Sequence, residues 1–203
     1  VPTRLVVATY NHKKLKELNE LLSDLPVQLL SLEGFKNIRE VEEDGETFKE
    51  NAEKKALGYA KQTGCLTLAE DSGLSIDYLK GEPGVYSARF AGPGKNDLKN
   101  CQKVLELMKK VPENEKSASF RCAATLAIAD KVLVTVEEKV EGKIADSMKG
   151  DGGFGYDPLF FYPEFGKTLA EVSAEMKHSV SHRGKALAKI KLFLTEYLKN
   201  SGT

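Results

Sequence analysis

Two adjacent carboxylates interrupt an apolar run in the middle of the chain. Residues 65–74 read Cys-Leu-Thr-Leu-Ala-Glu-Asp-Ser-Gly-Leu, which predicts a buried strand with Glu70 and Asp71 at its carboxyl end. Alternation along a strand sends the two acids to opposite sides, and we expect a turn at Gly73 to bring both toward one cleft. Hard oxygen ligands at such a strand end suit Mg²⁺ carrying a phosphorylated substrate. A solvated acidic turn is the alternative that this stretch leaves open.

A second candidate lies near the N-terminus, where a strand and a helix meet in a tight turn. Residues 4–9 read as a buried strand, and leucines recur at helical spacing after Asn11, a plausible helix cap. Thr9, Asn11 and Lys14 fall in the turn and the first helical turn, where backbone N–H groups and the helix dipole favour anions. The pattern therefore predicts a phosphate site, with ordinary capping by Asn11 beside a solvated Lys14 as the open alternative.

The next helix brings one lysine and one acid toward the same region. Residues 47–50 have the spacing of a capping box, and the helix that they open should end at Gly64. Glu43 precedes this cap and is available to face a metal. Lys55 is offset by one residue from the apolar stripe, so its spacing favours a solvated flank over a cation at the edge of a cleft.

The remaining periodicity predicts an α/β protein. Residues 27–32 read as a second strand, and residues 97–110 as an amphipathic helix. Two strands at 118–129 and 132–140 should form a hairpin. A last amphipathic helix begins after Ser181, which is a candidate cap.

A glycine-rich loop near residue 150 offers an aromatic side chain beside an acid. Residues 150–155 satisfy the glycine pattern of a dinucleotide site, but the sequence that follows is strand-like instead of helical, so NAD binding is not expected. Phe154 can stack on a nucleobase while Asp157 accepts from its edge. A core aromatic at the start of a strand is the alternative reading of Phe154.

Three further polar side chains gather around the start of the last helix. Lys177, His182 and Arg183 lie just before it or in its first turn, where an oxygen-rich ligand would be favoured. A cluster of this kind is often solvent-facing, and that reading stays open.

Composition limits the class of protein. The 203 residues suffice for one large domain or two small lobes, and 30 basic against 30 acidic residues argue against long nucleic-acid ligands. Three widely separated cysteines suggest neither a disulfide framework nor a zinc cluster. The sequence has neither a signal-peptide pattern nor an apolar run of membrane-spanning length, so we expect a cytoplasmic protein that binds no membrane.

Taken together, these motifs resemble those of the inosine triphosphate pyrophosphatase family, the pyrophosphatases of non-canonical purine nucleoside triphosphates. The resemblance runs nearly end to end and rests on residues 9–14, 43–55, 70–74, 83–89, 152–158 and 181–184. Two positions depart from the usual family pattern. Tyr10 stands where glycine is usual, which could reshape the phosphate turn, and Glu70 stands where many members have aspartate.

The resemblance implies hydrolysis of ITP, dITP or XTP to the monophosphate and pyrophosphate with Mg²⁺. It also implies a fold and an assembly: residues 1–203 would form one elongated two-lobed domain around a central mixed β-sheet with flanking helices. The nucleotide would lie in the cleft between the lobes, and the protein would be a homodimer.

The resemblance also assigns roles residue by residue. Asp71 would be the general base, and Glu43, Glu70 and Asp71 would lie at the metal, directly or through water. Residues that would hold the phosphates are Thr9, Asn11, Lys14 and Lys55, with Ser72 beside the substrate. Residues that would surround the base are Phe154, Gly155, Tyr156, Asp157, Lys177, His182 and Arg183.

Two rival functions remain at this stage. One is a pyrophosphatase for pyrimidine triphosphates, as in the related Maf proteins, against which Phe154 and residues 181–183 favour a purine. The other is a nucleotide sensor that binds without cleaving, against which the retained Asp71 argues.

Overall fold

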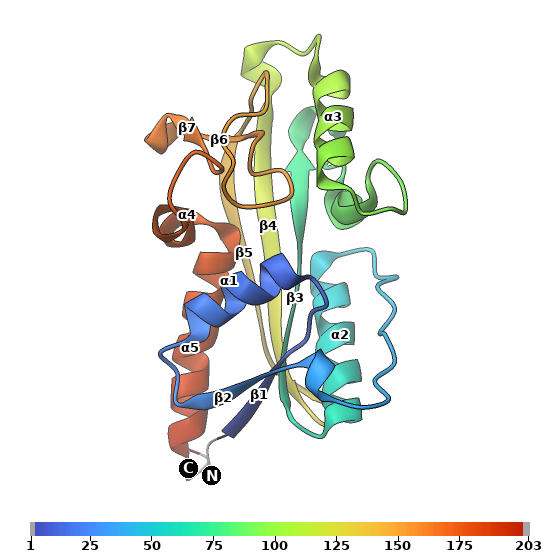
Figure 1. Cartoon of the computed structure of the whole chain (residues 1–203), viewed down its shortest axis with the longest axis vertical. Helices are drawn as coiled ribbons and strands as arrows, with labels where there is room; N and C mark the ends of the chain where they lie inside the picture. Colours follow the sequence, from blue (N-terminus) through green and yellow to red (C-terminus); the bar gives the residue numbers. More distant parts are fainter. Residues whose placement is uncertain (1–2, 201–203) are drawn as a thin grey trace. The chain divides into compact units, whose positions relative to one another are not determined.

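A single mixed sheet organises the part of the chain that the computed structural model describes, residues 3–200. The strand order is β2-β1-β3-β4-β5-β6-β7 (Figure 1). Strand β1 pairs in parallel with β2 and β3, whereas β6 pairs antiparallel with β5 and β7. The strands are β1 Thr3–Val7, β2 Val27–Ser31, β3 Leu66–Ile76, β4 Ser117–Ile128, β5 Lys131–Ile144, β6 Phe160–Tyr162 and β7 Lys167–Thr168. The predicted mixed α/β class is confirmed.

Five α-helices accompany the sheet within the described residues. They are α1 His12–Leu22, α2 Phe48–Thr63, α3 Asp97–Met108, α4 Ala174–Val180 and α5 His182–Asn200. None of these helices has the length and apolar character needed to cross a membrane. The chain divides into two compact units, the first built from residues 1–71, 122–138 and 183–203, and the second from residues 72–121 and 139–182. The expectation of one domain over residues 1–203 stays a prediction.

Alternation along β1 explains the two cores of the first unit. Leu5 and Val7 pack with the leucines of α1 and α5, whereas Val6 and Ala8 pack with alanines of α2. Successive side chains of a strand point to opposite faces, so α1 and α5 cover one face of the sheet and α2 covers the other. The same alternation continues along β3, where it decides the direction of each acid.

Local signals set the ends of α2 as the sequence predicted. Thr47 accepts a hydrogen bond from the N–H of Glu50, and the Glu50 carboxylate accepts one from the N–H of Thr47, which completes the capping box. Gly64 ends the helix in the left-handed region at φ 65°, where a residue without a Cβ is favoured.

Gly73 serves a purpose other than the predicted turn. Strand β3 continues through it to Ile76, so the expectation that the strand ends at the acids is wrong. A Cβ at this position would lie 2.7 Å from the carbonyl oxygen of Gly84 and closer still to the Ser87 hydroxyl. Glycine is therefore required because another segment of the second unit packs directly against the strand.

The second unit has a core of its own, built around α3 and the aromatic residues of the segment after the glycine-rich loop. Cys101, Val104 and Met108 of α3 pack with Phe120 of β4 and Phe160 of β6. The segment between residue 155 and β6 contains no helix, as the sequence after the glycines predicted. The predicted hairpin is consistent with β4 and β5, which are neighbours in the sheet separated by two residues.

Candidate active site

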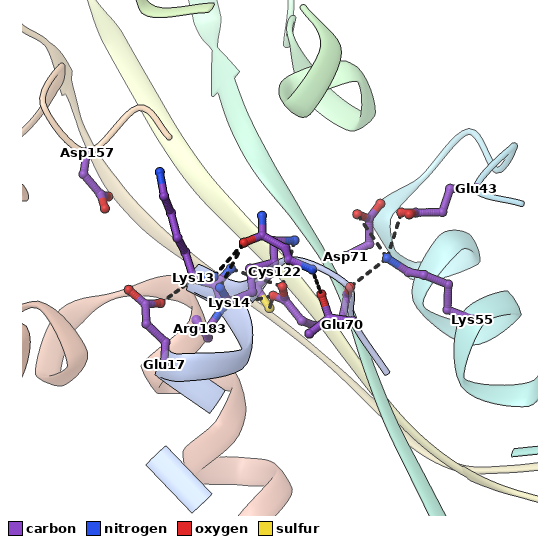
Figure 2. A network of polar contacts seen from close by, with 12 residues as sticks. Lys13, Lys14, Glu17, Glu43, Lys55, Glu70, Asp71, Cys122, Asp157 and Arg183 are labelled. Atoms are coloured by element: carbon purple, nitrogen blue, oxygen red, sulfur yellow. Dashed lines mark hydrogen bonds and ion pairs between the residues drawn. The ribbon is translucent and has the colours of Figure 1, made fainter. Parts of the chain in front are cut away.

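Strand β3 presents its two acids to opposite faces of the sheet. Glu70 lies on the same face of the strand as Leu66 and Leu68, which pack with α1 and α5. Asp71 lies on the same face as Ala69, which packs with α2. Glu70 consequently meets cations of α1 and α5, whereas Asp71 meets a cation of α2. Figure 2 shows Lys14 and Arg183 gathered at Glu70, and Lys55 beside Asp71.

Glu70 is surrounded by hydrogen-bond donors. Oε1 accepts from Lys14 Nζ at 2.8 Å and from Arg183 Nη2 at 3.2 Å, while Oε2 accepts from Arg183 Nε and from the Cys122 thiol, each at 3.2 Å. Burial by itself would raise the pKa of Glu70, but the charges of Arg183 and Lys14 outweigh it and hold that pKa well below its usual range. Glu70 is therefore ionised at neutral pH.

Arg183 joins this cluster to α1. Its Nη1 donates to Glu17 Oε2 at 2.7 Å, and only 2% of the residue is exposed. Burial opposes the charged form of Arg183, but Glu70 and Glu17 more than offset it and raise the pKa of the guanidinium. The structure therefore places Arg183 between two carboxylates of the first unit.

Asp71 lies in a different electrostatic setting. Its Oδ2 accepts from Asn51 Nδ2 at 3.1 Å, and its Oδ1 lies 3.7 Å from Lys55 Nζ. Burial raises the pKa of Asp71, and Glu43 adds to the shift, against the opposing charges of Lys55 and Lys14. An oriented carboxylate with a raised pKa is suited to accept a proton.

Lys55 connects Asp71 to the loop before α2. Its Nζ donates to Glu43 Oε2 at 2.7 Å and to the main-chain carbonyl of Glu70 at 2.9 Å. Only 8% of Lys55 is exposed, so the solvated position that its spacing favoured is wrong. Lys55 instead neutralises two acids that would otherwise repel each other.

The start of α1 is capped as predicted. Asn11 Oδ1 accepts from the N–H groups of Lys13 and Lys14 at 3.0 and 3.1 Å, and Thr9 Oγ1 accepts from Asn11 N at 3.1 Å. Because these N–H groups already have a partner, side chains would have to make a large part of any phosphate contact here. Lys14 is paired with Glu70 instead of being solvated, and Tyr10 lies edge-on to Tyr59 with ring centroids 6.4 Å apart.

The carboxylates near Lys55 are suited to bind a hard cation. Over the described residues, no group of three or more histidines, cysteines or acids stands close enough to hold a metal unaided. Mg²⁺ needs only one or two carboxylates, because waters and substrate phosphates complete its shell. Glu43 and Asp71, which share one lysine, fit that requirement.

Three of the residues that the resemblance assigned to the nucleobase lie together in the second unit. Asp157 Oδ2 accepts from Lys177 Nζ at 2.7 Å and from the Phe154 N–H at 2.8 Å, and the Lys177 ammonium lies 4.8 Å from the centroid of the Phe154 ring. His182 stacks on Phe120 with centroids 4.9 Å apart. This group presents an aromatic face beside a buried ion pair.

The other predicted residues of the second unit hold the loop in place. Gly155, at φ 62°, donates its N–H to Asp97 Oδ2 at 3.0 Å. The Tyr156 hydroxyl donates to the main-chain carbonyl of Ser87 at 2.7 Å, and Ser72 is half-buried on β3. Asp97 had no predicted role, although it opens α3 and anchors this loop.

The fold and these residues define an α/β protein with a buried cluster of lysines, arginine and carboxylates along β3. The model of the Ham1 family matches residues 5–193. The dITP/XTP pyrophosphatases of Desulforamulus reducens and Geobacter sulfurreducens are 53% and 52% identical to this chain, over 92% and 93% of it and 92% and 95% of their own lengths. A HAM1 protein from Coxiella burnetii has a solved structure with a TM-score of 0.86 and 41% identity, covering 96% of this chain and 99% of that one. The chain belongs to the Ham1 family.

Proposed function

We propose that this protein hydrolyses the non-canonical purine triphosphates dITP, XTP and ITP to the nucleoside monophosphate and pyrophosphate. The names of its relatives support the substrate class. The observation that carries the reaction type is the setting of Asp71, a buried carboxylate with a raised pKa beside a lysine and a second acid. An acid in that setting is a general base next to positive charge, as attack of water on a phosphoryl group requires.

The phosphate end of the substrate is assigned to the first unit. Lys14 and Lys55 would neutralise the phosphate oxygens, with Thr9 and Asn11 shaping the turn before α1. Glu43 and Asp71 would hold Mg²⁺, which when bound withdraws charge from the phosphoryl oxygens.

Asp71 would take a proton from the water that attacks the α-phosphorus. As the new P–O bond forms, the bond between the α-phosphorus and the bridging oxygen breaks, and pyrophosphate leaves with its electron pair. Asn51 holds one carboxylate oxygen at 3.1 Å, so the group is oriented before substrate arrives.

The nucleobase of the substrate is assigned to residues of the second unit. Phe154 would stack on the purine, and Lys177, which Asp157 holds at 2.7 Å, would donate to the 6-oxo edge. The amino group of adenine would then face donors, and an unpaired buried polar group costs about 1–3 kcal/mol. ATP should therefore be a poor substrate. On the family resemblance alone, the proposal also includes a homodimer located in the cytoplasm.

A substrate panel tests this function. The protein is incubated with Mg²⁺ and dITP, XTP, ITP, GTP, ATP or dUTP, and products are separated by ion-exchange chromatography. We expect monophosphate and pyrophosphate from dITP, XTP and ITP, and loss of both products in Asp71→Asn. Faster cleavage of dUTP than of the purine substrates would support a pyrimidine pyrophosphatase, and binding without cleavage would support a sensor. Release of a nucleoside diphosphate and inorganic phosphate would reject attack at the α-phosphorus.

A further inference from the structure

We propose that Glu70 is a positioning residue that fixes Lys14, and not a ligand of the metal. The inference rests on the proposed triphosphate hydrolysis, because Lys14 is assigned to the phosphates there. It reverses the expectation from sequence, which placed Glu70 with Glu43 and Asp71 at the metal.

Hydrogen-bond donors already occupy both oxygens of Glu70. A carboxylate offers about four lone-pair positions on its two oxygens. Lys14, Arg183 and Cys122 make four contacts with Glu70, two on each oxygen, at 2.8 to 3.2 Å. A metal could bind Glu70 only after one of these donors had left.

The charges around Glu70 also disfavour a metal. Two permanent cations already touch Glu70, so a divalent ion at the same oxygens would be repelled by both. Arg183 has little freedom to move away, because Glu17 holds its other nitrogen at 2.7 Å and the residue is buried. The opposite side of β3 offers a metal a better place, since Glu43 and Asp71 share a single lysine and Asp71 lies 3.7 Å from it.

The consequence concerns the first turn of α1. The Asn11 side chain fixes the backbone of Lys14, and Glu70 fixes its ammonium at 2.8 Å. Backbone and side chain of this lysine are thus both held before any substrate binds. Preorganised charge of this kind costs no reorganisation when the phosphoryl group reacts.

Metal binding separates positioning from ligation without any turnover. Mn²⁺ is titrated into the nucleotide-free protein and the free ion is followed by electron paramagnetic resonance. Glu70→Gln should bind Mn²⁺ within about threefold of the wild type, whereas the matched variant Glu43→Gln should bind at least about tenfold more weakly. A loss in Glu70→Gln as large as that in Glu43→Gln would overturn the assignment.

A double-mutant cycle tests whether Glu70 acts through Lys14. Lys14→Met and Glu70→Gln should each lower kcat/KM for dITP by roughly 10- to 100-fold, the range for one charge-assisted hydrogen bond. The double variant should lie within about threefold of Lys14→Met alone, because the lysine that Glu70 fixes is already gone. Losses that multiply would overturn the inference.

Lys55→Met supplies the control cycle. Lys55 contacts the main-chain carbonyl of Glu70, which Glu70→Gln retains, so Glu70→Gln should cost a further tenfold or more in that background. If Glu70→Gln left kcat/KM unchanged in the Lys55→Met background too, its effect would not be specific to Lys14, and the inference would be contradicted.

The outcomes distinguish a variant that does not fold, a failure of this inference and a failure of the proposed function. Glu70→Asp serves for both tests if Glu70→Gln does not fold. Because it keeps the charge, it should bind Mn²⁺ within about threefold of the wild type and lose less activity than Glu70→Gln, and that smaller loss should vanish in the Lys14→Met background. Normal dITP cleavage by the wild type together with lost Mn²⁺ binding in the Glu70 variants would reject positioning and leave the proposed function standing. A wild type that cleaves neither dITP nor XTP would reject the proposed function, and this inference with it.

Discussion

Lys55→Met should raise the pKa of Asp71, and the size of the effect follows from the structure. The Lys55 ammonium lies 3.7 Å from Asp71 Oδ1 and is one of the charges that oppose the raised pKa of that acid. Methionine keeps the length and apolar stem of lysine but removes the charge. Asp71 would then keep its burial and the repulsion from Glu43 and lose its nearest cation.

Coulomb's law sets the magnitude. At 3.7 Å and an effective dielectric constant of about 20, the attraction that the variant loses is about 4.5 kcal/mol. Water that enters in place of the ammonium returns part of this energy, so the rise in the pKa of Asp71 should be smaller than the full attraction would give. The sign is upward, because the lost charge stabilised the ionised form.

The measurement is a carbon-13 NMR titration of aspartate carboxyls in metal-free protein, with Asp71→Asn to assign the signal. Lys54→Met is the matched control, since Lys54 is the preceding residue, is exposed and pairs with Asp44. The Asp71 signal should titrate at higher pH in Lys55→Met and be unchanged in Lys54→Met. An unchanged Asp71 signal in folded Lys55→Met would refute the electrostatic reasoning.

The same shift has a consequence for stability and activity. A carboxyl group whose folded pKa exceeds its unfolded pKa adds stability below the unfolded value and loses it as the pH rises through the folded value. A base must also be ionised to act. The acid limb of the kcat profile should therefore move to higher pH in Lys55→Met.

Three further predictions concern stability. Arg183→Met should lower the free energy of unfolding in urea by about 3–5 kcal/mol, because it removes a buried cation that two carboxylates share. Lys191→Met, from an exposed pair, should cost at most about 1 kcal/mol, and equal losses would contradict the buried network. Gly73→Ala should lower the free energy of thermal unfolding by about 1–3 kcal/mol. The control Gly94→Ala, where a Cβ meets nothing within 4 Å, should lower it by less than about 0.5 kcal/mol, and a fully stable Gly73→Ala would rule out the close approach. Because the pKa of Glu70 is lowered, its stabilisation is complete above the ordinary carboxyl pKa of 4.5 and is lost as the pH falls below it. Wild-type stability should therefore fall more steeply with acid below that pH than the stability of Glu70→Gln.

Local rules predicted the elements of this fold well. The capping box before α2, the cap at Asn11 and the left-handed glycine after α2 depend on residues a few positions apart, and all three are confirmed. The short helix α4 was not predicted, because its seven residues are too few for a clear period.

The errors came where a distant segment decides the outcome. The spacing of Lys55 describes one helix, whereas its burial depends on Glu43 and on β3, which no helical period reports. Gly73 was assigned to a turn because glycine allows one, but the packing of Gly84 and Ser87 against the strand is what requires it.

Alternation could have revealed more of the cluster than it did. The parity of β3 alone places Glu70 and Asp71 on opposite faces, and the expected turn obscured this. Cys122 has the parity of the apolar residues Ala124 and Leu126 in β4, which pointed to the face covered by α5. Its contact with Glu70 joins positions 52 residues apart, so no local pattern reports it.

The direct test of the central claim is the destination of the water oxygen. Cleavage of dITP with Mg²⁺ in water enriched in oxygen-18 should place one labelled oxygen in the monophosphate and none in the pyrophosphate, as attack on the α-phosphorus requires. Label in the pyrophosphate, or label released in inorganic phosphate, would contradict the account.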